Sequence, residues 1–119
     1  DQEIEKNTLK AINEAEQVFL SKLFTTVAGN FPDDAFSVES LSKEIGMSRP
    51  HLYRNVRHLT GISPVAFIRN LRLNKALGLM KQRKKNITEI ALEVGINNPS
   101  YFAKCFHEKY GIVPSQFAV

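Results

Sequence analysis

Ten Lys and Arg side chains fall in the stretch from Ile45 to Thr88, which contains no Asp or Glu. A stretch of one sign repels itself unless a polyanion relieves it, so a phosphate backbone is the natural partner of these side chains. A solvated basic surface is the alternative that a run of charge alone leaves open. The ten residues are Arg49, Arg54, Arg57, Arg69, Arg72, Lys75, Lys81, Arg83, Lys84 and Lys85.

The charged side chains are unevenly distributed along the 119 residues. Residues 1–48 hold 4 basic and 9 acidic side chains, a net charge of −5, whereas residues 49–119 hold 12 basic and 3 acidic ones, a net charge of +9. This asymmetry predicts a basic binding face opposite an acidic one. The hydrophobic share of 43% is sufficient for a core, either in one compact domain or in two very small ones.

Histidine and cysteine are the other side chains that could do chemistry, and they are too few for an enzyme. His51 and His58 are seven residues apart and share a helix face, but no third ligand or carboxylate completes a zinc or catalytic set. We therefore expect no enzymatic activity, no metal and no cofactor. Cys105, the only cysteine, is expected to be a small core residue of a cytoplasmic protein.

Hydrophobic spacing predicts an all-α chain without strands. No apolar run of about 18 residues occurs, so we expect no membrane contact by this fragment, although a longer parent protein could be membrane-anchored. Ser37, Ser48, Asn86 and either Asn97 or Asn98 are expected helix N-caps. About seven helices are expected: one through Leu9, Ile12, Leu23 and Val27 that ends at Gly29, then helices near 37–45, 48–60, 63–82, 86–94 and 98–110, and a last turn from Pro114.

One helical pattern occurs twice. Leu41–Phe67 aligns with Ile90–Phe117, and each copy is a short helix, a turn that begins with Gly46 or Gly95, and a second helix. The predicted domains are an N-terminal linker or helix extension (1–16), a first helix-turn-helix subdomain (17–63), a linker helix (64–83) and a second helix-turn-helix subdomain (84–119). A linker of roughly 18 residues is about 27 Å long, and successive major grooves on one face of B-DNA lie about 34 Å apart. The two second helices are therefore predicted to enter adjacent major grooves of double-stranded DNA.

The outward faces of these two helices carry the candidate DNA contacts. Arg54 is the first choice for base recognition because a guanidinium can pair with guanine O6 and N7 together, and a phosphate clamp or surface ion pair is its alternative role. Lys104 holds the same place in the second copy. Candidate base contacts are Arg49, Pro50, Tyr53, Arg54, Asn98, Ser100, Ala103 and Lys104. Candidate backbone contacts are His51, Arg57, Lys84, Lys85, Tyr101 and His107.

These residues resemble the AraC/XylS family of transcriptional regulators over nearly the whole chain from about Phe19. The matching motifs in the first half are 46–48, 52–54, 60–64, 67–69 and 71–73. Those in the second half are Ile90-Ala91, Val94-Gly95-Ile96, Tyr101-Phe102, Phe106, Gly111 and Pro114. The sequences of residues 48–54 and of the turn at 59–61 resemble those of the C-terminal domains of Bacteroidetes hybrid two-component regulators. The resemblance implies promoter binding, transcription regulation, and upstream receiver and sensor domains in the full-length protein.

A helical protein-interaction or signal-relay module without base recognition is the alternative function. The N-terminal amphipathic helix could pair with a second copy or dock on an upstream receiver. Contact with RNA polymerase and a homodimer of the full-length protein are also open, as are the operator sequence and the sign of regulation.

Overall fold

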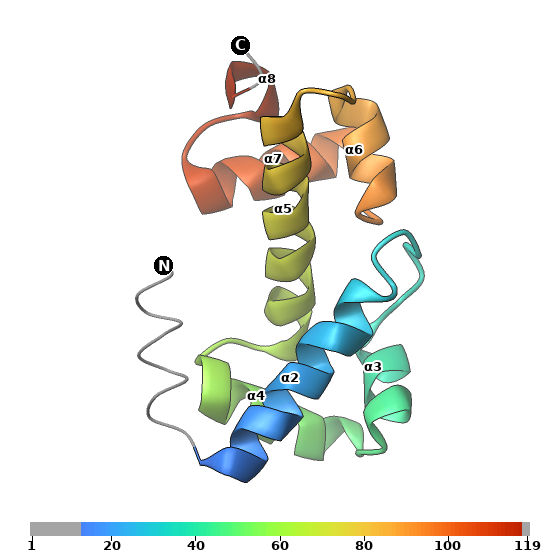
Figure 1. Ribbon diagram of the computed structural model, residues 1–119, viewed down its shortest axis with the longest axis vertical. Helices are drawn as coiled ribbons and strands as arrows, with labels where there is room; N and C mark the ends of the chain where they lie inside the picture. Colours follow the sequence, from blue (N-terminus) through green and yellow to red (C-terminus); the bar gives the residue numbers. More distant parts are fainter. Residues whose placement is uncertain (1–12, 118–119) are drawn as a thin grey trace. The chain divides into compact units, whose positions relative to one another are not determined.

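The helices are seen in a computed structural model that describes residues 13–117 (Figure 1). This part of the chain contains seven α-helices and no strand, which confirms the predicted all-α class. Leu9 and Ile12, predicted to lie on the first helix, fall outside the described residues. The helices are α2 (Glu14–Ala28), α3 (Val38–Ile45), α4 (Arg49–Thr60), α5 (Pro64–Gln82), α6 (Ile87–Glu93), α7 (Pro99–Tyr110) and α8 (Pro114–Phe117).

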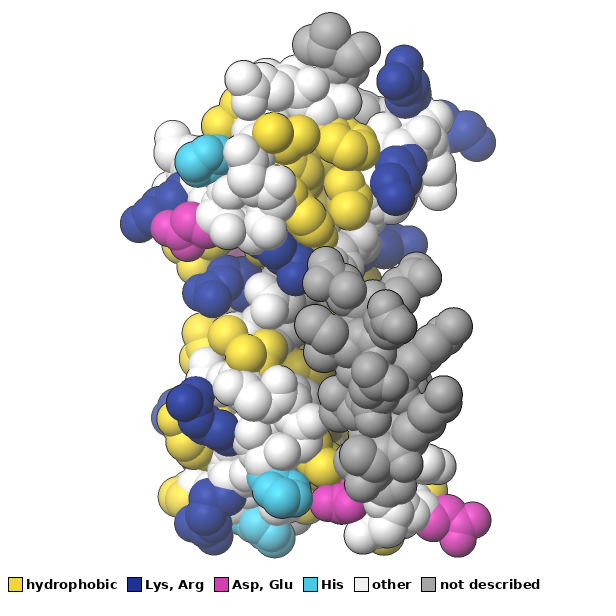
Figure 2. All heavy atoms as spheres, turned by 90° about the vertical axis from the view of Figure 1, so that its left-hand side faces the viewer, with side chains coloured by type: hydrophobic (Ala, Val, Ile, Leu, Met, Phe, Trp, Pro, Cys, Tyr) yellow, Lys and Arg dark blue, Asp and Glu magenta, His cyan; other side chains and the backbone are white. Residues whose placement is uncertain are grey.

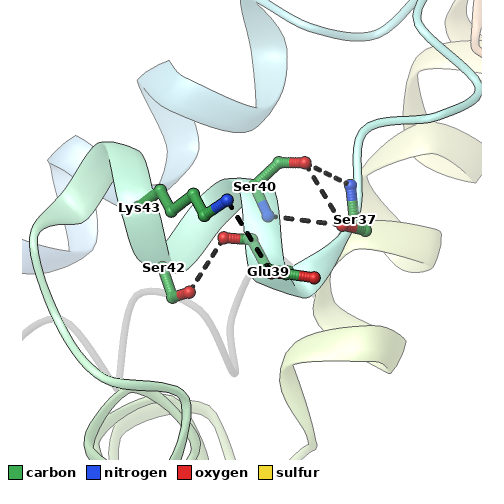
Figure 3. Close-up of polar contacts among 5 residues, drawn as sticks. All are labelled: Ser37, Glu39, Ser40, Ser42 and Lys43. Carbon is green, nitrogen blue, oxygen red and sulfur yellow. Dashed lines mark hydrogen bonds and ion pairs between the residues drawn. The ribbon is translucent and has the colours of Figure 1, made fainter.

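Side-chain caps explain where most of these helices begin. Helix α3 starts at Ser37, whose hydroxyl accepts from the Ser40 N–H at 3.3 Å, while the Ser40 hydroxyl accepts from the Ser37 N–H (Figure 3). Glu39 in the first turn also pairs with Lys43 one turn later. Such reciprocal caps satisfy N–H groups that have no partner inside the helix.

Side-chain N-caps also begin the other helices whose first residues were predicted. Ser48 caps α4, Asn98 caps α7, and Asn86 with Glu89 forms a capping box at α6. These caps confirm the predictions and decide between Asn97 and Asn98. A further capping box, formed by Asn13 and Glu16, starts α2. The observed starts therefore agree with local sequence chemistry.

Contacts divide the chain into two compact units. Unit 1 contains α2, α3, α4 and the start of α5 as far as Ile68. The Phe24 ring packs at 5.3 Å, centroid to centroid, against the Phe67 ring, yet Phe24 keeps 39% of its surface exposed. The buried hydrophobic side chains of unit 1 are Leu20, Leu23, Val27, Leu41, Leu52, Val56, Leu59, Phe67 and Ile68.

Unit 2 contains the rest of α5, the helices α6, α7 and α8, and the segment 30–36 from the connection between α2 and α3. Phe102 and Phe106, predicted as the buried stripe of α7, have no exposed surface. The Phe106 ring also packs against Tyr110 and Phe117. The buried cluster comprises Leu73, Ala76, Met80, Ile90, Ala91, Val94, Ile96, Phe102, Cys105 and Phe106.

Candidate nucleic-acid interface

The first helix-turn-helix motif comprises α3, a turn at Gly46 and α4. Gly46 has φ +80°, a left-handed conformation that favours glycine and ends α3. Leu52, Val56 and Leu59 bury one face of α4, as their spacing predicted. The predicted DNA contacts of this helix are all exposed: Arg49, Pro50, His51, Tyr53, Arg54 and Arg57.

The second motif comprises α6, a turn at Gly95 and α7. Gly95 also has φ +80°, and α7 buries Phe102, Cys105 and Phe106. Of the predicted contacts on this helix, Ala103 is half-buried, so only part of its methyl surface faces solvent. The exposed contacts are Asn98, Ser100, Tyr101, Lys104 and His107. Each motif thus separates a buried apolar face from an exposed face of basic and polar side chains.

The basic side chains of the two exposed faces keep their charges available. Within residues 13–117, no ion pair involves Arg49, Arg54 or Arg57, and none involves Lys104. In the view of Figure 2, Lys and Arg side chains are more prominent than Asp and Glu side chains. An exposed cation without a carboxylate partner can pair with phosphate or a base edge without first breaking an internal bond.

Two predicted contacts are already engaged. The Asn98 Oδ1 accepts from the Tyr101 N–H at 3.1 Å as the cap of α7. Pairing with adenine through both the oxygen and the nitrogen of the amide would have to share that oxygen with the cap, through its second lone pair. Lys85 forms an ion pair with Glu93, whereas the neighbouring Lys84 is exposed. A phosphate contact of Lys85 would therefore compete with a carboxylate.

Arg72 differs from the other members of the basic stretch because it lies inside unit 2. It is 5% exposed, and its guanidinium donates to the carbonyl oxygens of Phe31 (2.5 Å), Val94 (2.5 Å) and Asp33 (2.9 Å). Burial lowers the pKa of Arg72 from its ordinary value, and the carboxylates of Asp33 and Asp34 oppose that shift. Counting Arg72 among the polyanion-binding charges was therefore wrong, since its charge serves internal hydrogen bonds.

The two histidines of α4 and the cysteine have different surroundings. His58 lies 3.6 Å from a carboxylate oxygen of Glu16, and His51 is exposed. Among residues 13–117, no group of three or more His, Cys, Asp or Glu side chains could hold a metal ion. Cys105 is buried in the core of unit 2, as predicted. Within the same residues, no helix combines the length and apolar character that crossing a membrane requires.

Sequence and structure comparisons agree with this geometry. A family described as "Helix-turn-helix domain" matches residues 41–118, about two thirds of the chain. A transcriptional regulator of Chromobacterium violaceum with an AraC-type DNA-binding domain superimposes with a TM-score of 0.79 at 25% identity, covering 89% of this chain and 94% of that one. The chain belongs to the AraC-type helix-turn-helix family. It is a DNA-binding domain of transcription regulators.

Two further relatives are a histidine kinase and a response regulator. Histidine kinase P4 of Formosa agariphila is 36% identical over 106 residues, which are 89% of this chain and 8% of the kinase. The C-terminal domain of AraT, a response regulator of Geobacillus stearothermophilus, superimposes with a TM-score of 0.77 at 25% identity, covering 84% of this chain and 83% of that one. This AraC-type domain therefore spans only a small part of the kinase that it matches.

Proposed function

We propose that this AraC-type domain binds specific sequences of double-stranded DNA through α4 and α7, each in a major groove. The observation that supports this most strongly is the pair of exposed faces opposite the buried stripes of α4 and α7. Arg54 on α4 and Lys104 on α7 are exposed on these faces, and neither forms an ion pair among the described residues 13–117. A major groove admits an α-helix and displays a different pattern of donors and acceptors for each base pair.

Adjacent grooves of one duplex are the proposed arrangement of the two motifs. The support is that α5 is one unbroken helix of 19 residues, which corresponds to about 28 Å. Selecting preferred sites from random duplexes measures the two half-sites and the distance between them. A spacing of about one helical turn, 10–10.5 base pairs, supports adjacent grooves, whereas a single short site contradicts them.

Arg54→Ala tests base recognition on the selected site. We expect a loss of about 1–3 kcal/mol in binding free energy and relaxed preference at one base pair. Competition assays with duplexes substituted at each position measure this preference. If Arg54→Ala weakens binding equally for every duplex, Arg54 is a phosphate contact and its proposed role in base recognition is wrong.

Lys104→Ala tests the second motif. We expect weaker binding to all sequences and a salt dependence whose log–log slope falls by about 1, because one phosphate contact is lost. Lys109→Ala is the matched control, since Lys109 is exposed on the same helix but lies about 140° around its axis from Lys104. Equal effects of the two substitutions would mean that α7 contributes only general positive charge.

The two-component context is a further part of the proposal. It is supported by the match to a histidine kinase and by the likeness to a response regulator domain. This context includes an upstream receiver and sensor and a cytoplasmic DNA target. It decides neither contact with RNA polymerase nor dimerisation of the longer protein. In a full-length protein with such a receiver, phosphorylation is expected to change the affinity for the selected site, and an unchanged affinity would contradict this context.

A further inference from the structure

The segment 30–36 contacts the turn of the second helix-turn-helix motif, although more than 50 residues separate them in sequence. The Arg72 guanidinium bridges the two: one nitrogen, Nη1, donates both to the Phe31 carbonyl in the segment and to the Val94 carbonyl at the end of α6. The other nitrogen, Nη2, donates to the Asp33 carbonyl. Hydrogen bonds from a buried charged group are stronger than neutral ones, so Arg72 ties the segment firmly to the end of α6.

A second bond joins the segment to the residue before the α7 cap. Asn97 Nδ2 donates to Asp34 Oδ2 at 2.6 Å. Asn97 directly precedes Asn98, the N-cap of α7. One end of the turn between α6 and α7 is therefore bridged to the segment by Arg72, and the other end is bonded to the segment directly.

The spacing at Gly95 shows how closely the segment and the turn approach. A Cβ atom at Gly95 would lie 2.2 Å from the Phe31 carbonyl oxygen, whereas one at Gly46 in the first motif would meet nothing within 4 Å. The two turns share the same φ but not the same surroundings. The first turn is open at its glycine, and the second is covered there by the segment.

We propose that the segment 30–36 is a positioning element for the second recognition helix, with Asp34 holding Asn97 and thereby fixing how α7 enters DNA. The inference rests on the proposed DNA contact of α7. The family match begins at residue 41, so this segment lies outside the residues that define the family. A contact on DNA is effective only when its side chain is held in the productive geometry by surrounding bonds. Fixing the start of α7 also removes an ordering cost on binding.

The lost charge and the lost positioning are expected to change the DNA affinity of Asp34→Ala in opposite directions. Removing a carboxylate makes the protein more positive, which by itself raises affinity for every DNA sequence. Losing the bond to Asn97 lowers affinity, and only where α7 meets its own half-site. Asp34→Asn separates the two effects, because its amide oxygen can still accept from Asn97 while the charge is gone.

The experiment compares these variants of the 119-residue chain on three duplexes. One duplex is the selected site, and the other two have the α4 half-site or the α7 half-site scrambled. Arg54→Ala, which is expected to relax preference at one base pair, identifies the half-site of α4, and the other half-site is then that of α7. Glu108→Ala removes an exposed carboxylate from α7 without touching the segment, and so measures the effect of a lost negative charge on the same helix.

Asp34→Ala is expected to weaken binding to the intact site by roughly 2- to 12-fold, the range of one net hydrogen bond. The loss should persist when the α4 half-site is scrambled and disappear when the α7 half-site is scrambled. Asn97→Ala should give the same pattern, the double variant should add nothing further, and Asp34→Asn should restore selectivity. Thermal melts of each variant separate this effect from a general loss of stability.

Two results would overturn the inference. If Asp34→Ala raises affinity for all three duplexes as Glu108→Ala does, the bond to Asn97 does not position α7. If Asp34→Ala lowers the melting temperature but leaves half-site selectivity intact, the segment is only structural. If Lys104→Ala leaves the affinity for DNA unchanged, the proposed DNA contact of α7 is wrong. The inference would then fail together with the proposed function.

Discussion

Alanine at Gly95 should disrupt unit 2 far more than alanine at the matching Gly46 disrupts unit 1. Both glycines have φ +80°, so alanine at either position carries the cost of a left-handed backbone, about 1–2 kcal/mol. At Gly95 the added Cβ would also lie 1.8 Å from Arg72 Nη1 and 2.2 Å from the Phe31 carbonyl oxygen. Contacts this short force the guanidinium and the segment 30–36 apart.

The extra cost at Gly95 follows from the bonds that must break. Losing one hydrogen bond to a charged group costs about 1.5–3 kcal/mol. Gly95→Ala should therefore destabilise unit 2 by about 2.5–5 kcal/mol, and Gly46→Ala should destabilise unit 1 by only the cost of the left-handed backbone. A loss of this size is a large fraction of the stability of a small domain.

Native-state hydrogen exchange is the suitable assay because it measures the opening of each unit by its own amides. Amides of α3 and α4 report the free energy of opening of unit 1, and those of α6 and α7 report unit 2. Urea unfolding followed by circular dichroism gives the change for the whole chain. The reasoning is refuted if Gly95→Ala costs no more than Gly46→Ala, since the two differ only in what the added Cβ meets.

Three further predictions concern unit 2. Phe106→Ala should lower the free energy of unfolding by about 3–5 kcal/mol because the ring is fully buried, and urea titration measures it. Asn86→Ala should cost about 1 kcal/mol by removing the α6 cap, which a thermal melt detects. Burial raises the pKa of Tyr110 to about 12, and its hydroxyl donates to Asn74 Oδ1 at 2.6 Å. Because tyrosine in the unfolded chain ionises near pH 10, stability should be full below about pH 10 and fall as the pH rises toward 12. Thermal melts across this range should fall less steeply for Tyr110→Phe, and an equal fall would contradict the assignment.

Local chemistry explains why most of the helices could be predicted. A capping side chain and the N–H groups it satisfies are within three residues of each other, so Ser37, Ser48 and Asn86 indicate helix starts without knowledge of the fold. The buried stripe of α7 follows in the same way from the spacing of Phe102 and Phe106. Once the buried stripes of α4 and α7 are known, the opposite face of each helix is the exposed one.

The role of Arg72 shows what a charge count misses. Arg72 and Arg54 are the same residue type, and both lie in the stretch from Ile45 to Thr88 that contains no Asp or Glu. One signal separates them: Ile68, Arg72, Ala76 and Met80 are four residues apart, so they share one face of α5, and all four are buried. An arginine within a buried stripe must find acceptors inside the protein, because an unpaired buried charge is too costly.

The acceptors themselves could not have been predicted from spacing. Phe31 and Asp33 lie about 40 residues before Arg72, and they contribute main-chain oxygens, which every residue carries. A repeat in sequence also makes Gly46 and Gly95 equivalent, since both turns need the same backbone conformation. Only the packing of the segment 30–36 makes them different. The two motifs therefore share a local design, but the second depends on a segment outside the repeat, so substitutions in that segment should affect DNA recognition by α7 and leave α4 unchanged.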